Sequence, residues 1–291
     1  HTTMEQKQMV RVAIFALLIL AQVTYAQVKI GAKVGYSLGR IADNSDNIYT
    51  EDYENTDGVD FGATVEFPIS ELFSIQTEVL FTQRGGERFG LQPIPSDLLL
   101  DALEDNNIPA EFLNVIMLAN GRGPVTNEDP LYADFDNISE LQYLEIPVLA
   151  KFGWGDDWRF YVEGGPYVGF LLSADQVTNG ETFFYTDSSG NQVVQIPNPI
   201  HIPGDPTTGP PFLGPIPEQD FTATTDVKDD LNEVMFGIHA GAGLIRKLNE
   251  KHELYLGFRG SYSFTTLQKD STFGESHIGG LVFSLGYAYT L

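Results

Sequence analysis

The sequence predicts an all-β protein, an eight-stranded antiparallel up-and-down transmembrane β-barrel with long extracellular loops, one of which contains short helices. Two observations predict this fold. Apolar and polar residues alternate in successive segments of the chain, and a period of two residues is typical of strands with one apolar face. Short and long connections also alternate strictly between these segments, as they do when strands cross a membrane in turn.

The last segment shows the alternation most clearly. Its apolar face runs from Leu281 through Phe283 to Leu291, and the other face starts at Val282. The same pattern recurs in eight segments, each long enough to cross a bilayer at the usual tilt, which takes about 9–11 residues. The expected strands are 27–40, 58–68, 73–85, 143–154, 158–172, 232–248, 252–264 and 277–291.

The connections fall into two classes. Tight turns are expected at 69–72, 155–157 and 249–251. Long loops are expected at 41–57, 86–142, 173–231 and 265–276, of which 86–142 and 173–231 are large insertions. In a barrel of this type the short turns face the periplasm and the long loops face outward.

Residues 1–26 are predicted to be a secretory signal peptide, which leaves 27–291 as the barrel domain. Its features are the cations Lys7 and Arg11, an apolar run over 12–21, and the small residues Thr24 and Ala26. This run is about half of the roughly 20 residues that a membrane-spanning helix requires. An uncleaved anchor is the alternative. Residues 1–3 precede the first methionine and are expected to be an upstream artefact.

The face opposite the apolar one carries balanced charges separated by glycines. These charged residues are Lys29, Lys33, Glu66, Glu78, Glu145, Lys151, Arg159, Glu163, Glu253 and Arg259. In a membrane barrel this face lines the interior, which in an eight-stranded barrel holds only side chains. Oppositely charged residues that pair can fill it, so we predict an interior charge network. In a soluble barrel the same residues would instead be the solvated face.

Aromatic residues favour the membrane alternative, because rings at one height on several strands form interfacial belts. One set lies on the apolar face beside the expected turns or near the chain end: Phe67, Phe73, Trp154, Trp158 and Tyr289. A second set lies near the opposite rim: Phe81, Phe170, Tyr262 and Phe264.

The chain end carries the pattern of a barrel assembly signal. Ser284, Gly286, Tyr289 and Leu291 occupy its polar, glycine and two apolar positions, although a terminal aromatic is more usual than leucine. The pattern resembles the signal by which outer-membrane barrels engage the barrel assembly machinery, and we expect that machinery to be a partner.

Several strands resemble the PorT-like outer-membrane β-barrel family of Bacteroidetes. The segments are AQVKIG at 26–31, YLEIPVLAKF at 143–152, GGPYVGFLL at 164–172 and FGIHAGAGL at 236–244. The resemblance covers all eight strands but not the long loops. It implies an integral protein of the bacterial outer membrane, in contact with its lipid and lipopolysaccharide. It also implies an accessory role in type IX protein secretion as one possible function, and it supplies no catalytic motif.

The negative charge is concentrated in the loops. Segments 41–57, 85–140, 173–230 and 265–276 hold 28 acidic and 4 basic residues, a net of 4 − 28 = −24, which equals the formal charge of the whole chain. This charge excludes general binding to nucleic acid, which requires cations. Solubility and repulsion of other anionic surfaces explain it. Divalent-cation bridging to lipopolysaccharide phosphates is the alternative.

The two large insertions are expected to contain structure. Ser96 can begin a helix that runs to about Glu104, and Pro109 suits the first turn of a second helix that ends near Ala119. These helices are expected to pack on each other or on the barrel rim, or else to bind a partner or a membrane surface. A hairpin is indicated over 183–194. The eight prolines of 197–217 predict an extended lid or arm without regular sheet.

An enzyme requires a constellation of reactive groups, and the sequence offers none that fits. His239 is expected to face the interior as a hydrogen-bonded structural residue. We therefore expect a non-enzymatic protein without cofactor or metal. The expected function is structural, or binding of a ligand or an envelope protein through the acidic extracellular loops. A narrow pore and an accessory part in type IX secretion are the alternatives.

Overall fold

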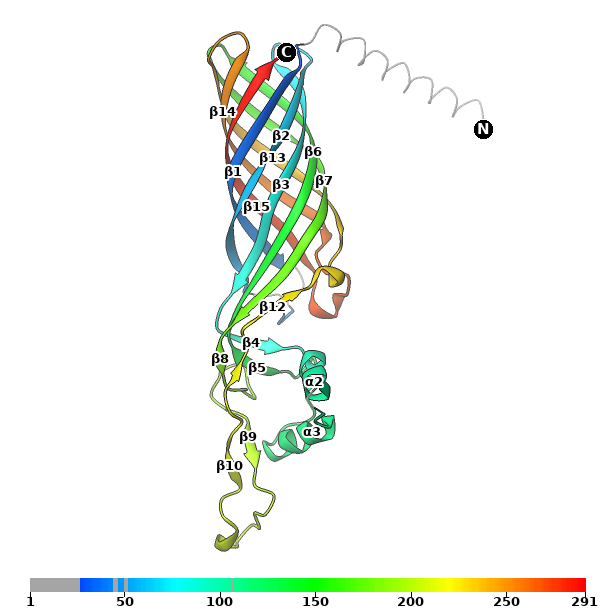
Figure 1. Ribbon diagram of the computed structural model, residues 1–291, viewed down its shortest axis with the longest axis vertical. Helices are drawn as coiled ribbons and strands as arrows, with labels where there is room; N and C mark the ends of the chain where they lie inside the picture. The colour runs from blue at the N-terminus through cyan, green and yellow to red at the C-terminus, as the bar shows by residue number, and fades with distance from the viewer. Residues whose placement is uncertain (1–26, 44–46, 50–51, 106) are drawn as a thin grey trace, which may run out of the picture.

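The computed structural model describes residues 27–43, 47–49, 52–105 and 107–291 (Figure 1). The predicted signal peptide lies outside these residues. Eight long strands form the wall of a barrel. They are β1 (Lys29–Asp43), β2 (Glu54–Pro68), β3 (Phe73–Arg88), β6 (Asp136–Gly155), β7 (Trp158–Asn179), β13 (Val234–Lys247), β14 (His252–Thr266) and β15 (Ser276–Thr290).

The ring closes between the first and last strands. β1 pairs with β15 from Lys29↔Thr290 to Asp43↔Ser276, and every other neighbouring pair is also antiparallel. A ninth strand, β12 (Ala223–Asp226), pairs only with the distal part of β7. The structure thus confirms the predicted eight-stranded up-and-down barrel. We call the end with the three tight turns the turn end and the other the loop end.

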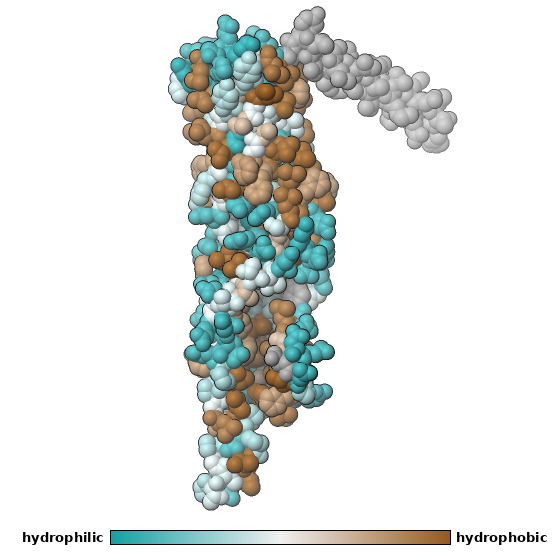
Figure 2. All heavy atoms as spheres, in the orientation of Figure 1, coloured by the Kyte–Doolittle hydropathy of each residue, from teal (hydrophilic) through white to brown (hydrophobic). Residues whose placement is uncertain are grey.

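The outer face of the barrel is apolar. Along β6 and β7, Val148, Trp154, Trp158 and Phe160 point outward and are about half exposed. Figure 2 shows hydrophobic side chains over this part of the molecule. Aromatic rings gather at the turn end, where Phe73 and Phe152 lie 4.8 Å apart. Tyr262 and Phe264 are exposed near the loop end. Exposed apolar side chains in a continuous band require a lipid environment.

Several strands extend farther at the loop end than the sequence pattern predicted, among them the three that lead into the loop domain. β3 runs to Arg88, β6 begins at Asp136 and β7 ends at Asn179. The ladder between β6 and β7 continues to Asp136↔Asn179, past a bulge opposite Tyr143. Most outward residues in this region are polar, with Ile138 and Val177 as exceptions, so the apolar alternation weakens while the backbone pairing continues.

Residues 89–135 and 180–222 together form a separate unit beyond the loop end, which we call the loop domain (Figure 1). Its strands are β4 (Leu91–Ile94), β5 (Leu131–Asp134), β8 (Glu181–Thr182), β9 (Gln195–Pro197), β10 (Phe212–Pro215) and β11 (Gln219–Asp220). Its helices are α2 (Ser96–Asp105) and α3 (Ala110–Ala119), close to the predicted bounds. Short 3-10 helices occupy Pro206–Thr208, Lys228–Asp230 and Ser271–Phe273. Within the described residues, no helix is long and apolar enough to cross a membrane.

The proline-rich segment projects away from the barrel as an arm and does not cover its mouth (Figure 1). The expectation that it adds no regular sheet was wrong, because β9 pairs with β10. Pro197 and Pro215 lie at the ends of these strands, where a missing N–H interrupts no further pairing. The preceding hairpin is short, with a bridge between Tyr185 and Val193.

Interior glycines make room for tyrosine rings from neighbouring strands. The Tyr161 ring lies against Gly243 and Gly257, and the Tyr255 ring lies against Gly286. A methyl group added at Gly286 would lie well inside contact distance of the Tyr255 ring, which is buried. The glycine pattern of the strands therefore reflects packing across the lumen.

We predict that Gly286→Ala destabilises the folded barrel by about 1–3 kcal/mol, the usual cost of overpacking. The measurement is urea unfolding of protein refolded in detergent, followed by the difference in gel mobility between folded and unfolded forms. Gly260→Ala is the matched control, since its added methyl would meet Leu281 at an ordinary 3.6 Å. Equal stability of the two variants would contradict the packing role of Gly286.

Candidate functional site

The lumen contains three groups of charged side chains at successive heights. Nearest the turn end is the vestibule cluster, formed by Lys29, Glu66, Lys151 and Glu253. Lys29 Nζ lies 2.7 Å from Glu253 Oε2, and Lys151 Nζ lies 2.9 Å from Glu66 Oε2. Alternating signs across four strands let each ion meet an opposite charge.

The central cluster is built around Arg259 on β14. Its guanidinium donates two hydrogen bonds to Glu78, of 2.7 and 2.9 Å, and two to Glu163, of 2.8 and 2.5 Å. Lys33 Nζ lies 2.9 Å from Glu78 and 3.8 Å from Asp60. Five strands contribute to this cluster, so its ion pairs join the wall of the barrel across the lumen.

The outer cluster lies nearer the loop end. Arg84 lies 3.4 Å from Glu145 and donates a hydrogen bond to Ser37. The Nε2 atom of His239 lies 3.2 Å from Glu145, and its ring lies 4.4 Å from that of Tyr167. His239 is 2% exposed. The imidazole is thus enclosed between protein groups.

The predicted charge network differs from the structure in three residues. All of its predicted members except Arg159 form ion pairs in these clusters. Arg159 instead donates to the backbone carbonyls of Glu71 and Gly153, at the rim of the turn end. Arg84 and Asp60 belong to the network but were not predicted. The alternation along each strand could have revealed them. Arg84 is an even number of residues from Glu78 and Asp60 is an even number from Glu66, so each points to the same face as a predicted member.

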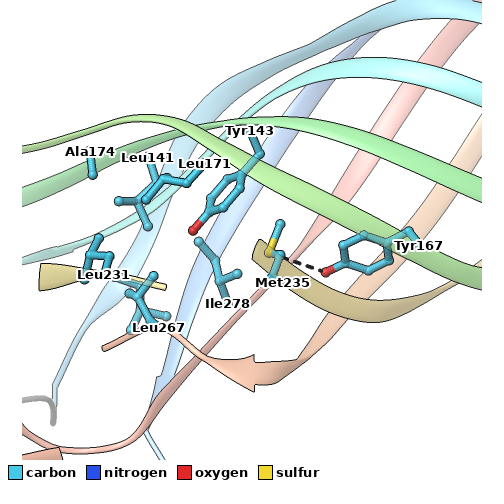
Figure 3. Packing of buried hydrophobic residues seen from close by; sticks show 10 residues of the cluster. Leu141, Tyr143, Tyr167, Leu171, Ala174, Leu231, Met235, Leu267 and Ile278 are labelled. Carbon is cyan, nitrogen blue, oxygen red and sulfur yellow. Dashed lines mark hydrogen bonds between the residues drawn. The ribbon is translucent and has the colours of Figure 1, made fainter. Parts of the chain in front are cut away.

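An apolar plug closes the lumen on the loop-end side of the outer cluster (Figure 3). Its members are Ile41, Leu141, Tyr143, Tyr167, Leu171, Ala174, Leu231, Met235, Leu267 and Ile278. Leu231 and Leu267 lie in the two connections that flank β13 and β14, and Asn232 N donates to Leu267 O at 2.9 Å. These connections fold inward, so the mouth is covered by apolar side chains.

A cavity of about 1050 Å³ opens at the turn end. The vestibule cluster, Arg159 and the three tight turns line it. Tyr161 also lines it and packs with the buried Tyr255, and Lys151 Nζ is 4.5 Å from the centre of the Tyr161 ring. The cavity is therefore a vestibule at the turn end, which reaches as far as Tyr161.

The loop domain has an apolar core to which both large insertions contribute. Leu113, Ile116, Met117 and Leu131 come from the first insertion and Val194 from the second, and all are buried. Tyr132 and Tyr185 exchange two backbone hydrogen bonds of 3.0 and 2.8 Å, which join the insertions directly. The helices thus pack on each other and on the other insertion.

The first loop also contacts the loop domain. Tyr49 donates a hydrogen bond to Asn127 O at 3.1 Å, and Asn127 Oδ1 accepts from the N and Oγ atoms of Ser96 at the start of α2. Burial in this contact raises the pKa of Tyr49 to about 12. The loop domain is therefore held to the barrel by the first loop as well as by the strands that lead into and out of the two insertions.

The residues of the predicted assembly signal all lie on β15 or directly after it. Ser284 and Gly286 face the lumen, and Tyr289 packs edge-on against His252. Leu291 N donates to Val28 O at 3.0 Å, and the Leu291 side chain is exposed. Across the part of the chain that the structure describes, no group of three or more histidines or acids is arranged to hold a metal ion.

A closed ring of eight strands with an apolar outer band and charges inside defines an outer-membrane β-barrel. The chain belongs to the family described as "Outer membrane protein beta-barrel domain", whose model matches residues 15–269. The protein is accordingly integral to the outer membrane, with the loop end outside and the turn end toward the periplasm.

Solved structures similar to the chain are also outer-membrane proteins. Ail, the attachment invasion locus protein of Yersinia pestis, is 9% identical over 90% of this chain and 99% of its own, with a TM-score of 0.37. OprG from Pseudomonas aeruginosa is 6% identical over 91% of this chain and 97% of its own, with a TM-score of 0.38. No curated protein matches the chain.

We predict that Arg259→Met lowers the free energy of unfolding by about 3–5 kcal/mol, because it leaves Glu78 and Glu163 buried without their shared partner. Arg246→Met is the matched control. Arg246 pairs with Asp157 at the exposed turn end, where an ion pair contributes about 0–1 kcal/mol. Urea unfolding in detergent measures both. Similar losses in the two variants would show that the central cluster does not hold the barrel together.

Proposed function

We propose that the protein is a non-conducting, non-enzymatic barrel that holds the loop domain outside the cell for binding to another envelope component or a ligand. The observation that carries this proposal is the shared core of the two insertions. Long loops that served only to connect strands would not require a common set of buried residues from α3, β5 and Val194.

The closed lumen supports an anchoring role over transport. The central cluster and the apolar plug are both nearly inaccessible, with Glu78 at 1% and Leu141 at 2% exposure. Opening a path would separate buried ion pairs and expose apolar side chains, each at a cost of several kcal/mol. The enclosure of His239 supports a non-enzymatic role, since a general base must reach its substrate.

We predict that the protein in planar lipid bilayers shows no steady single-channel openings. The Arg84→Ala variant is expected to conduct no better than the wild type, because the apolar plug still closes the lumen on the loop-end side of the outer cluster. Bilayer recordings at both polarities provide the measurement. Steady openings of the wild-type protein would support the narrow-pore alternative and contradict the anchoring role.

Partner binding is tested by chemical cross-linking on intact cells. Leu91 and Asp134 are paired across β4 and β5, so a short turn can replace 91–134 without straining the barrel. We expect cross-linked partners of the full chain to be lost from this variant while heat-modifiable gel mobility persists. Identical partners in both proteins would contradict binding through the first insertion of the loop domain.

The PorT-like resemblance supplies the alternative of an accessory part in type IX secretion. It concerns the strands alone, and segments 26–31, 143–152, 164–172 and 236–244 carry it. A deletion strain tests it independently of the loop domain. Loss of secreted cargo that a barrel lacking 91–134 restores would favour this alternative over the proposed one.

A further inference from the structure

One face of α3 is apolar and exposed. The helix contains two polar residues, Glu111 and Asn114. One side of it packs into the core of the loop domain, and the opposite side presents Phe112, Val115 and Leu118, which are 52%, 57% and 75% exposed. We call these three residues the α3 face. A helix that is apolar on all sides is normally buried, so this face has the composition of a covered surface.

The surroundings of the α3 face are strongly acidic. Segment 95–130 contains seven acidic residues and one basic residue, Arg122. Arg122 already forms an ion pair with Asp129. The other carboxylates are all solvent-exposed: Asp97, Asp101, Glu104, Asp105, Glu111 and Glu128. The apolar face therefore belongs to a segment whose exposed charges are nearly all negative.

This charge distinguishes between the surfaces that could cover the face. A second copy of the chain would bring the same carboxylates toward their counterparts, and like charges across an interface cost several kcal/mol. The lipopolysaccharide surface is anionic as well and is repelled. A cationic polypeptide is favoured by both apolar burial and charge attraction. Its apolar side chains bury the face while its lysines and arginines approach the carboxylates.

We infer that the α3 face docks a cationic segment of another protein that also carries apolar side chains. Phe112, Val115 and Leu118 recur every three residues and form a strip along the helix, which suits an amphipathic partner. Phe112, at the N-terminal end of this strip, is its main anchor, because aromatic side chains dominate such contacts. This inference rests on the proposed function and adds the surface and the chemistry of the partner.

The arm offers a matched control surface. Three of its apolar residues, Ile200, Ile202 and Leu213, are 70%, 57% and 65% exposed. Asp205 is the one acidic residue of segment 198–213. The arm therefore exposes as much apolar side chain as the α3 face but lacks the acidic surroundings.

The test places the photoreactive amino acid p-benzoylphenylalanine at Val115 in one full-length variant and at Ile202 in another, in intact cells. Heat-modifiable gel mobility verifies that each barrel is folded. We expect a cross-link at position 115 to a protein whose cross-linked segment, mapped by mass spectrometry, has an excess of lysine and arginine. We expect this cross-link to fall at least tenfold in the triple variant Asp97→Asn/Asp101→Asn/Glu104→Gln and at 0.5 M NaCl.

Other outcomes overturn the inference. A cross-link at 115 to a second copy of the chain, to lipopolysaccharide, or to a neutral or acidic segment would each do so. A cross-link that is unaffected by salt and by the triple variant would also do so. Cross-links at 202 without any at 115 would leave the proposed function standing and overturn this inference alone. The absence of a cross-link at both positions would count against both.

Discussion

The narrow lumen of an eight-stranded barrel is the constraint on which the rest of this structure depends. It has room for side chains and little else, so each ion that points inward must find an opposite charge. Arg259 meets this requirement by binding Glu78 and Glu163 together. Because those partners come from other strands, pairing inside the lumen also fixes which strands face each other across it.

The same constraint explains the distribution of glycine. Tyr161 and Tyr255 are too large for a lumen lined on all sides by side chains, and glycines on the adjacent strands make room for their rings. Charges, tyrosines and the apolar plug then fill the lumen in layers. The barrel is a packed core with its polar groups inside and its apolar groups outside, which is the reverse of a soluble domain.

The sequence was sufficient for the barrel because strand identity is local. Alternation, turn length and the positions of Trp154 and Trp158 are properties of short segments. The missed ion pair of Arg84 shows the limit of such local patterns, because its partner Glu145 lies in another strand. Within its own strand, the only indication was that Arg84 and Glu78 point to the same face. The loop domain could not be predicted in this way. Leu131 and Val194 meet across more than sixty residues of chain, and no local pattern records that contact.

The extended strand pair β6–β7 sets how far the loop domain lies from the membrane. β7 has 22 residues, a contour of roughly 70 Å at about 3.3 Å per residue. At the usual tilt this is roughly twice the height of an apolar band of about 25 Å. The wall of the barrel thus continues as a rigid stalk beyond the lipid. The loop domain at the end of this stalk is therefore held well clear of the membrane surface (Figure 1).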